Sequence, residues 1–243
     1  MSTTISDLEW VIGIGSLTAV IIGISLSILT LLSYKETKKP MLLYSGILFF
    51  LLPFPWLAQS SLFIMALLDV KQMNYTLYLV IAIGAFPLFS TLWMFITASL
   101  YTDRPKLKFY IATIYGLLGI GMYIDVFVIG GQYQEENNSI FINTVFNTYT
   151  RLLLVFCIIS VIVFVGGSYI YFSIKSTSAL FKIRSTLIGV GSICFAFAGM
   201  IDGVVEHVTI PIMIFGRSLI TISFILLYLG YKTPNFIRQK YES

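Results

Sequence analysis

The order of apolar and polar residues divides the chain into seven long apolar runs, separated by short segments that carry charges or turn residues. Each run is longer than the roughly 20 residues that a helix needs to cross the 30 Å hydrocarbon core of a bilayer. None shows the strict alternation of a transmembrane β-strand. The pattern therefore predicts an all-α bundle of seven transmembrane helices in a single integral membrane domain (residues 1–243), with spans at about Leu8–Tyr34, Met41–Leu68, Tyr75–Tyr101, Phe109–Gly130, Tyr149–Ile174, Ser185–Glu206 and Pro211–Tyr231.

The first run is interpreted as a retained helix. Its N-terminal flank, Met1–Glu9, holds Asp7 and Glu9 and no Lys or Arg. A secretory signal peptide needs a basic flank and a shorter apolar stretch.

Basic residues indicate the orientation of the bundle. Twelve of the 15 Lys and Arg residues follow the odd-numbered runs, whereas Lys71 is the single loop cation on the other side. The positive-inside rule then predicts an outer N-terminus, a cytoplasmic C-terminus and a multi-pass protein of the plasma membrane. The twelve are Lys35, Lys38, Lys39, Arg104, Lys106, Lys108, Lys175, Lys182, Arg184, Lys232, Arg238 and Lys240.

Composition excludes most other classes of protein. Of the 243 residues, 58% are hydrophobic and 11% charged, the mean hydropathy is +0.92, and the formal net charge is +4. A soluble domain carries roughly 25% charged residues. The chain is therefore predicted to be neither disordered, nor a nucleic-acid-binding module, nor a soluble enzyme, and its main partner is the lipid bilayer.

Ionisable residues inside the spans are the strongest signal of function. They gather in the outer halves of four helices, although one charge at a helix centre costs about 2.5–3.5 kcal/mol. We expect an outward-facing polar pocket in which Arg217 pairs with Asp202 or Asp125, with Gly131–Thr148 as its lid. An equally acceptable interpretation is a structural ion-pair network that locks the helices together. The candidate residues are Gln59, Tyr123, Asp125, Arg151, Asp202, Glu206 and Arg217, with Ser60, Ser61 and His207 nearby.

Prolines and glycines predict where helices bend or approach one another. Pro53 and Pro55 in the second run and Pro87 in the third remove backbone hydrogen bonds, so their helices are expected to bend and open a cavity. Gly199 and Gly203 form a GxxxG pattern, which is typical of close helix packing. We expect that packing within the bundle, with a homodimer seam as the alternative.

Several membrane chemistries do not fit the sequence. Seven spans in this length match the size of a microbial rhodopsin, but no predicted span holds the Lys that covalent retinal requires. A single histidine, His207, is too few for haem with two axial histidines or for a zinc hydrolase. Asp125 and Asp202 lack the glycine-aspartate signature of aspartyl intramembrane proteases. We therefore expect no cofactor, no metal and no enzymatic activity.

Several segments resemble a family of uncharacterised archaeal membrane proteins with about seven spans, common in Asgard lineages. The resemblance implies the seven-helix fold and an archaeal plasma membrane, and it implies no ligand. The segments are Met41–Tyr44, Trp56–Leu57, Arg104–Lys106, Leu180–Arg184, Ala198–Asp202, Phe215–Leu219 and Leu226–Gly230.

The leading functional hypothesis is a receptor- or sensor-like protein that binds a small solute or ion and signals through a separate cytoplasmic partner. The basic cytoplasmic face is also suited to anionic lipid head groups. One alternative is a transporter or proton-coupled channel that uses Asp125, Asp202 and Glu206 as carriers. A second is a structural subunit of a membrane complex.

Overall fold

The computed structural model describes residues 5–70, 73–129, 132–135, 140–141, 143–204 and 209–233. Within them, the seven predicted spans are confirmed as helical segments that are long and apolar enough to cross a membrane. Their ends differ from the predicted ones by a few residues, because some helices continue past the apolar run into charged sequence. The spans are Asp7–Thr37, Pro40–Leu67, Tyr75–Ala98, Pro105–Ile129, Thr148–Lys175, Ala179–Gly203 and Ile210–Lys232.

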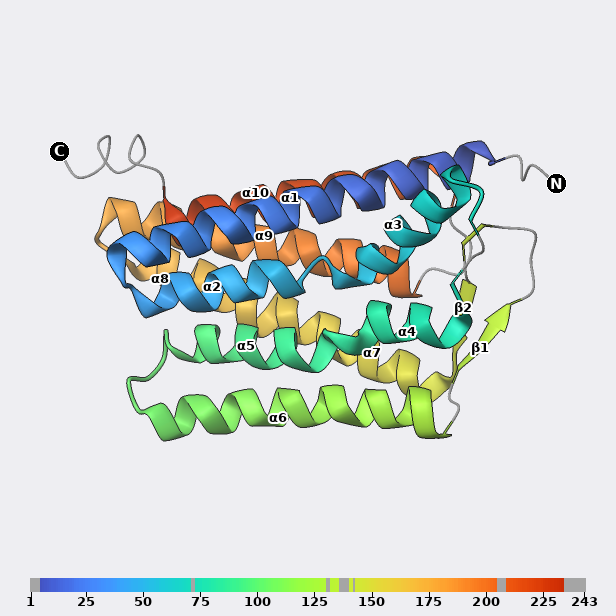
Figure 1. Cartoon of the computed structure of the whole chain (residues 1–243). Helices are drawn as coiled ribbons and strands as arrows, with labels where there is room; N and C mark the ends of the chain where they lie inside the picture. Colours follow the sequence, from blue (N-terminus) through green and yellow to red (C-terminus); the bar gives the residue numbers. More distant parts are fainter. Residues whose placement is uncertain are drawn as a thin grey trace.

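Three of the spans are single helices: α1 (Asp7–Thr37), α9 (Ala179–Val204) and α10 (Ile210–Lys232). α10 packs against both α1 and α9, so these three form one side of the bundle (Figure 1). The other four spans are interrupted. They comprise α2 (Pro40–Leu51) with α3 (Phe54–Leu67), α4 (Tyr75–Gly84) with α5 (Phe86–Ala98), α6 (Pro105–Ile124) with the π-helical segment η1 (Asp125–Ile129), and α7 (Thr148–Ser160) with the π-helical segment η2 (Val161–Gly167) and α8 (Ser168–Lys175).

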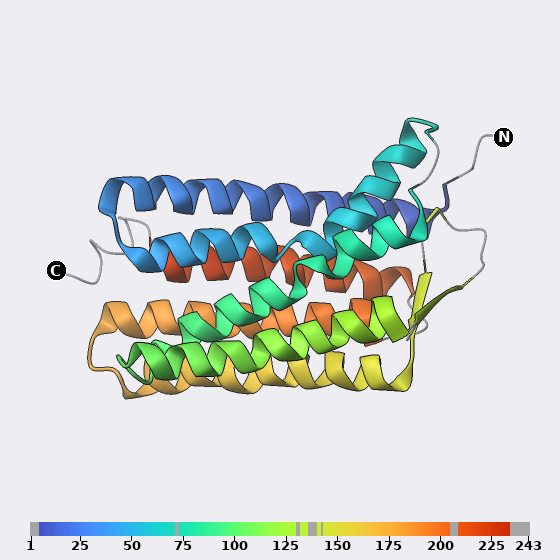
Figure 2. The same ribbon diagram turned by 60° about the horizontal axis from the view of Figure 1, so that its bottom comes forward.

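Prolines mark the first two interruptions, as the sequence predicts. Pro53 lies at the break between α2 and α3, and Pro87 lies in the first turn of α5, where α4 has just ended. α3 leans towards the N-terminal half of α1, which it contacts. α4 and α5 run obliquely across the bundle in Figure 2. The breaks therefore spread the helices apart in one half of the molecule.

A short β-hairpin lies at the end of the bundle where α1 begins (Figure 1). Its strands β1 (Gln132–Glu135) and β2 (Asn143–Phe146) are antiparallel, with Gln132 opposite Phe146. The hairpin is part of the predicted lid, of which the structure describes residues 132–135, 140–141 and 143–148. Glu9 of α1 accepts a 2.6 Å hydrogen bond from the backbone N–H of Ile140, which ties this segment to the first helix.

The two ends of the bundle differ in charge. The hairpin, the end of α3 and the starts of α4 and α10 lie at one end, here called the hairpin end. The α1–α2, α5–α6 and α8–α9 connections lie at the opposite end, here called the basic end, because the odd-numbered spans finish there. Lys71, Arg238 and Lys240 lie outside the described residues. The cations that flank the basic end are Lys35, Lys38, Lys39, Arg104, Lys106, Lys108, Lys175, Lys182, Arg184 and Lys232.

Core packing also differs between the two halves. Towards the basic end, Leu48, Phe49, Phe224 and Leu227 have no exposed surface and form part of one large apolar cluster. A second cluster lies near the hairpin end and includes Ile140 and other buried residues of α3, α4 and α6. The site described next lies beside these clusters, where the bent helices diverge.

Candidate functional site

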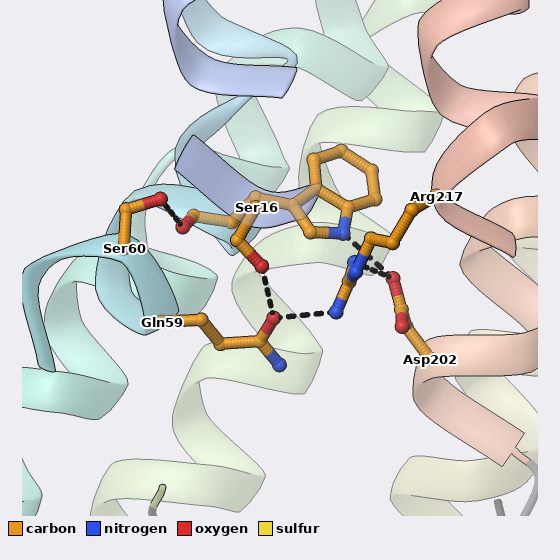
Figure 3. A network of polar contacts seen from close by, with 6 residues as sticks. Ser16, Gln59, Ser60, Asp202 and Arg217 are labelled. Atoms are coloured by element: carbon orange, nitrogen blue, oxygen red, sulfur yellow. Dashed lines mark hydrogen bonds and ion pairs between the residues drawn. The ribbon is translucent and has the colours of Figure 1, made fainter. Parts of the chain in front are cut away.

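Arg217 of α10 is the centre of a buried polar network. Its Nη1 donates to Asp202 Oδ2 on α9 at 2.7 Å, and its Nη2 donates to Gln59 Oε1 on α3 at 2.7 Å (Figure 3). The predicted pairing of Arg217 with Asp202 is therefore confirmed. Arg217 is only 5% exposed. A guanidinium at this depth needs a counter-charge, because an isolated buried charge costs several kcal/mol.

Two further residues complete the network. Trp56 of α3 donates its indole N–H to Asp202 Oδ2 at 2.6 Å, and Ser16 of α1 donates to Gln59 Oε1 at 2.9 Å. Sequence reasoning noted Trp56 only as part of the family resemblance and missed Ser16 altogether. The spacing of Trp56 and Gln59 contained a usable signal, because residues three apart share one helix face. Ser16 gave none, since hydroxyls are common in membrane helices.

A glycine on α1 makes room for the arginine. A Cβ atom at Gly15 would lie 2.5 Å from Cγ of Arg217, which is far inside van der Waals contact. The aliphatic part of the Arg217 side chain therefore lies directly against the backbone of α1. Close approach at a small residue is common between membrane helices.

A cavity of about 890 Å³ adjoins the network. This volume falls within the roughly 300–1,000 Å³ of pockets that bind small molecules. Trp56, Gln59 and Asp202 belong to its wall. The wall is less polar than the sequence led us to expect, and its other polar residues include Tyr78, Ser90, Tyr115, Thr144, Arg151 and Thr209. Most of the lining is apolar, including Pro55, Leu79, Ala82, Ile83, Phe86, Phe89, Trp93, Met94, Met122, Leu154, Ile158, Val161, Phe195, Ala196 and Met213.

Gly199 and Gly203 face this cavity, so the expectation that they pack against another helix is wrong. Both residues line the cavity, and a Cβ at either would have no neighbouring atom within 4 Å. Asp202 lies three residues after Gly199 and shares its helix face. The two glycines therefore give the cavity volume beside the Asp202 carboxylate.

The hairpin borders the cavity at one end. Phe141, Thr144 and Phe146 are lining residues, in agreement with the predicted lid position. The lining continues along α5 as far as Trp93 and Met94. The cavity thus extends from the hairpin end into the middle of the bundle.

Asp125 belongs to a separate cluster, although the sequence allowed it as a partner of Arg217. It is 4% exposed and accepts hydrogen bonds from the Thr150 hydroxyl and, at 3.5 Å, from Nδ2 of Asn147. These contacts join the end of α6 to the start of α7. Asp125 is not among the cavity-lining residues, so its observed contacts are structural.

The remaining candidates are distributed around the site. Arg151 lines the cavity, whereas Tyr123 packs on Phe127 with ring centroids 4.4 Å apart and is not in the lining. Ser60 and Ser61 donate to carbonyl groups of their own helix and are also absent from the lining. Glu206 and His207 lie outside the described residues.

Glu9 is a buried carboxylate that the sequence analysis treated only as part of the N-terminal flank. It is 7% exposed and forms a capping box with Ser6, in addition to its bond to Ile140. The Ser-x-x-Glu spacing from Ser6 to Glu9 is a readable capping signal. No feature of the sequence predicted the long-range contact with Ile140.

The network suits hydrogen bonding better than metal or redox chemistry. Within the described part of the chain, no three His, Cys, Asp or Glu side chains gather as a metal site requires. Cys157 and Cys194 are free thiols. The arginine and aspartate charges balance, which leaves polar atoms beside an apolar chamber. This arrangement can hold the polar end of a small molecule.

Comparisons with known proteins add no relative. No family model matches the chain, and no curated protein or solved structure is detectably similar to it. The resemblance to archaeal seven-span proteins therefore stays a prediction. What is established is a seven-helix membrane protein fold with a buried ion pair beside a large cavity.

Proposed function

We propose that the chain is a receptor-like membrane protein that binds a small molecule in the cavity beside Asp202. The hairpin end would face outwards across a plasma membrane, and a separate protein would receive the signal at the basic end. The observation that carries the proposal is the cavity of about 890 Å³ with a fixed polar network in its wall. Such a combination of apolar walls and few oriented polar groups is typical of ligand sites.

The extent of the cavity favours a receptor over a transporter. The cavity lining reaches the hairpin at one end and stops near Trp93 and Met94 at the other. Between these residues and the basic end, the interior is filled by side chains such as Phe49 and Phe224, neither of which has exposed surface. A transporter must open to both sides, whereas a receptor needs only one opening.

The charge of Asp202 points the same way. A carboxylate that carries protons must take up and release them, but Asp202 is held by Arg217 and Trp56. These contacts suit Asp202 to fixing the geometry of the site.

The basic end supports the proposed orientation. Besides its many cations, it carries three helix ends at which a lysine lies over a tyrosine four residues earlier: Lys38 over Tyr34, Lys175 over Tyr171 and Lys232 over Tyr228. Tyrosine and lysine are both favoured at the edge of the hydrocarbon core, and excess lysine is favoured on the cytoplasmic side. We therefore assign the basic end to the cytoplasm.

Side-specific labelling of a cysteine at position 199 tests the proposal. In a Cys157→Ala/Cys194→Ala background, Gly199→Cys places a thiol on the cavity wall. The reagent is an uncharged, membrane-impermeant sugar-linked methanethiosulfonate, applied to intact cells and to inside-out vesicles. We expect modification in intact cells only. The matched control is Gly121→Cys on α6, which has no neighbour within 4 Å, lies outside the cavity lining, and should stay unmodified in lipid.

Each other result would contradict the proposal in a defined way. Modification from both sides would indicate a transporter. Modification in inside-out vesicles alone would reverse the orientation. A thiol at position 199 that reacts in neither preparation would show that the cavity is closed to solutes.

A further inference from the structure

We infer that the cavity binds a largely apolar molecule with one neutral hydrogen-bonding end, such as a hydroxyl, and that this end lies between Asp202 and Gln59. The inference rests on the proposed function, because it names the chemistry of the ligand for the same cavity.

The walls require a mostly apolar ligand. Away from the network, the lining includes the aromatic side chains of Phe86, Phe89, Trp93 and Phe195. Apolar surface buried against such walls contributes roughly 25 cal/mol per Å². A polar group placed against these rings would lose its water without gaining hydrogen bonds, which costs about 1–3 kcal/mol for each unpaired group.

Asp202 offers one hydrogen-bond acceptor to the cavity. Its Oδ2 already accepts from both Arg217 and Trp56. Its Oδ1 has no hydrogen bond to another side chain that the structure describes, and the Asp202 side chain is 17% exposed within the cavity lining. The free oxygen can therefore accept from an O–H or N–H group of the ligand.

Gln59 offers the matching donor, together with the hydroxyl of Tyr78, a lining residue that is hydrogen-bonded to the Gln59 side chain. Because a guanidinium can only donate, the amide group must turn its oxygen towards Arg217, and the same oxygen accepts from Ser16. The amide nitrogen then points away from the network, as Figure 3 shows. Among the described residues, Gln59 and Asp202 thus present a donor and an acceptor on the same wall.

Charge balance favours a neutral ligand end. Arg217 and Asp202 cancel one another, so an ammonium group would meet the guanidinium and a carboxylate would meet the aspartate. Arg151, another charged residue of the wall, is engaged in an interaction of its own. A buried ion without a counter-charge is costly. A hydroxyl can donate to Asp202 and accept from Gln59, and it carries no charge.

Quenching of tryptophan fluorescence tests this chemistry. The chain has three tryptophans, and Trp10→Phe leaves Trp56 and Trp93, both in the cavity lining. The probes are 12-bromododecan-1-ol, 1-bromododecane and 12-bromododecanoate, whose bromine quenches tryptophan, added to the protein in nanodiscs and expressed as mole fraction in the lipid. We expect saturable quenching, with a midpoint for the alcohol at least tenfold lower than for either other probe.

Variants separate binding in the cavity from quenching by surrounding lipid. Gly199→Leu fills the cavity and should abolish the saturable component, whereas Gly121→Leu adds the same side chain on the outside of α6 and should keep it. Gln59→Leu should raise the midpoint for the alcohol towards that of the bromoalkane, because only the hydrogen bond to Asp202 remains, and should leave the midpoint for the bromoalkane unchanged. Thermal denaturation of each variant confirms that it is folded.

The possible results distinguish this inference from the proposed function. Equal midpoints for alcohol and bromoalkane would overturn the hydrogen-bonding end, and strongest quenching by the carboxylate would overturn its neutrality. Absence of saturable quenching by all three probes would overturn the inference that the ligand is largely apolar. If the thiol at position 199 still reacted only from outside, the proposed function would stand without this ligand class.

Discussion

Arg217 is almost fully buried, and it contacts the Asp202 carboxylate, the Gln59 amide and the backbone of α1 at once. We expect Arg217→Leu to lower the free energy of unfolding by about 3–5 kcal/mol, because Asp202 is left buried without its counter-charge. Arg217→Leu/Asp202→Leu should lose less than the single variant, since both charges are gone. Titration of the purified protein with sodium dodecyl sulfate, followed by circular dichroism, measures the difference. Equal or greater loss in the double variant would contradict the pairing.

Gly15 determines whether Arg217 can reach its partners. Gly15→Ala places a methyl group where Arg217 Cγ now lies, so the arginine or α1 must move. We expect a loss of about 1–3 kcal/mol in unfolding free energy from this overpacking. Gly121→Ala is the matched control, because a Cβ there meets no atom within 4 Å. It should be neutral or slightly stabilising, since alanine favours a helix more than glycine does. The same titration measures both variants, and equal effects would refute the close contact.

At the scale of elements, the tie between α1 and the hairpin keeps the lid in place. Glu9 bonds Ser6 within its own helix and Ile140 across the connection. We expect Glu9→Leu to speed hydrogen exchange of residues 140–146 by roughly 10–100-fold, since a hydrogen bond to a charged group contributes about 1.5–3 kcal/mol. Asp7→Leu removes an exposed acid from the same turn and serves as the control. Exchange at residues 140–146 that is equally slow in both variants would show that the hairpin is held by other contacts.

Local sequence predicted the elements better than their faces. Apolar runs are long enough to identify all seven spans, and Pro53 and Pro87 identified two of the breaks. The face that a helix turns to its neighbours depends on distant residues, which is why Gly199 was assigned to packing although it faces a cavity. The π-helical segment at Asp125 likewise showed no recognisable pattern, and contact with Thr150 of the next span could not be deduced from spacing.

The charged residues of the candidate site could be predicted from the sequence, but its uncharged residues could not. Arg217 and Asp202 were found because buried opposite charges must compensate one another, and that requirement holds whatever the fold. Trp56 and Ser16 carry no charge and therefore need no counter-charge, so the sequence did not predict that they have partners inside the bundle. The buried carboxylate of Asp125 accepts hydrogen bonds from a hydroxyl and an amide instead of pairing with a cation. Composition alone cannot distinguish these two arrangements.

On the scale of the whole molecule, the two halves of the bundle differ in packing and in charge. The half near the basic end is packed with apolar side chains and bordered by cations, which suits anchoring at an anionic membrane surface. In the hairpin half, the bent helices leave a chamber with a neutral polar network in its wall. A ligand in this chamber would touch helices of both sides of the bundle, so it could shift their packing without crossing the membrane.

The most direct test of the ligand cavity is an electron cryomicroscopy map of the protein purified from its native membrane into nanodiscs. We predict non-protein density between Trp56, Trp93 and Gly199, with one end within hydrogen-bond distance of Asp202 and Gln59. The Arg217–Asp202 pair should be intact beside it. A map in which side chains fill this space, so that no ligand-sized chamber remains between α3, α5 and α9, would contradict the account.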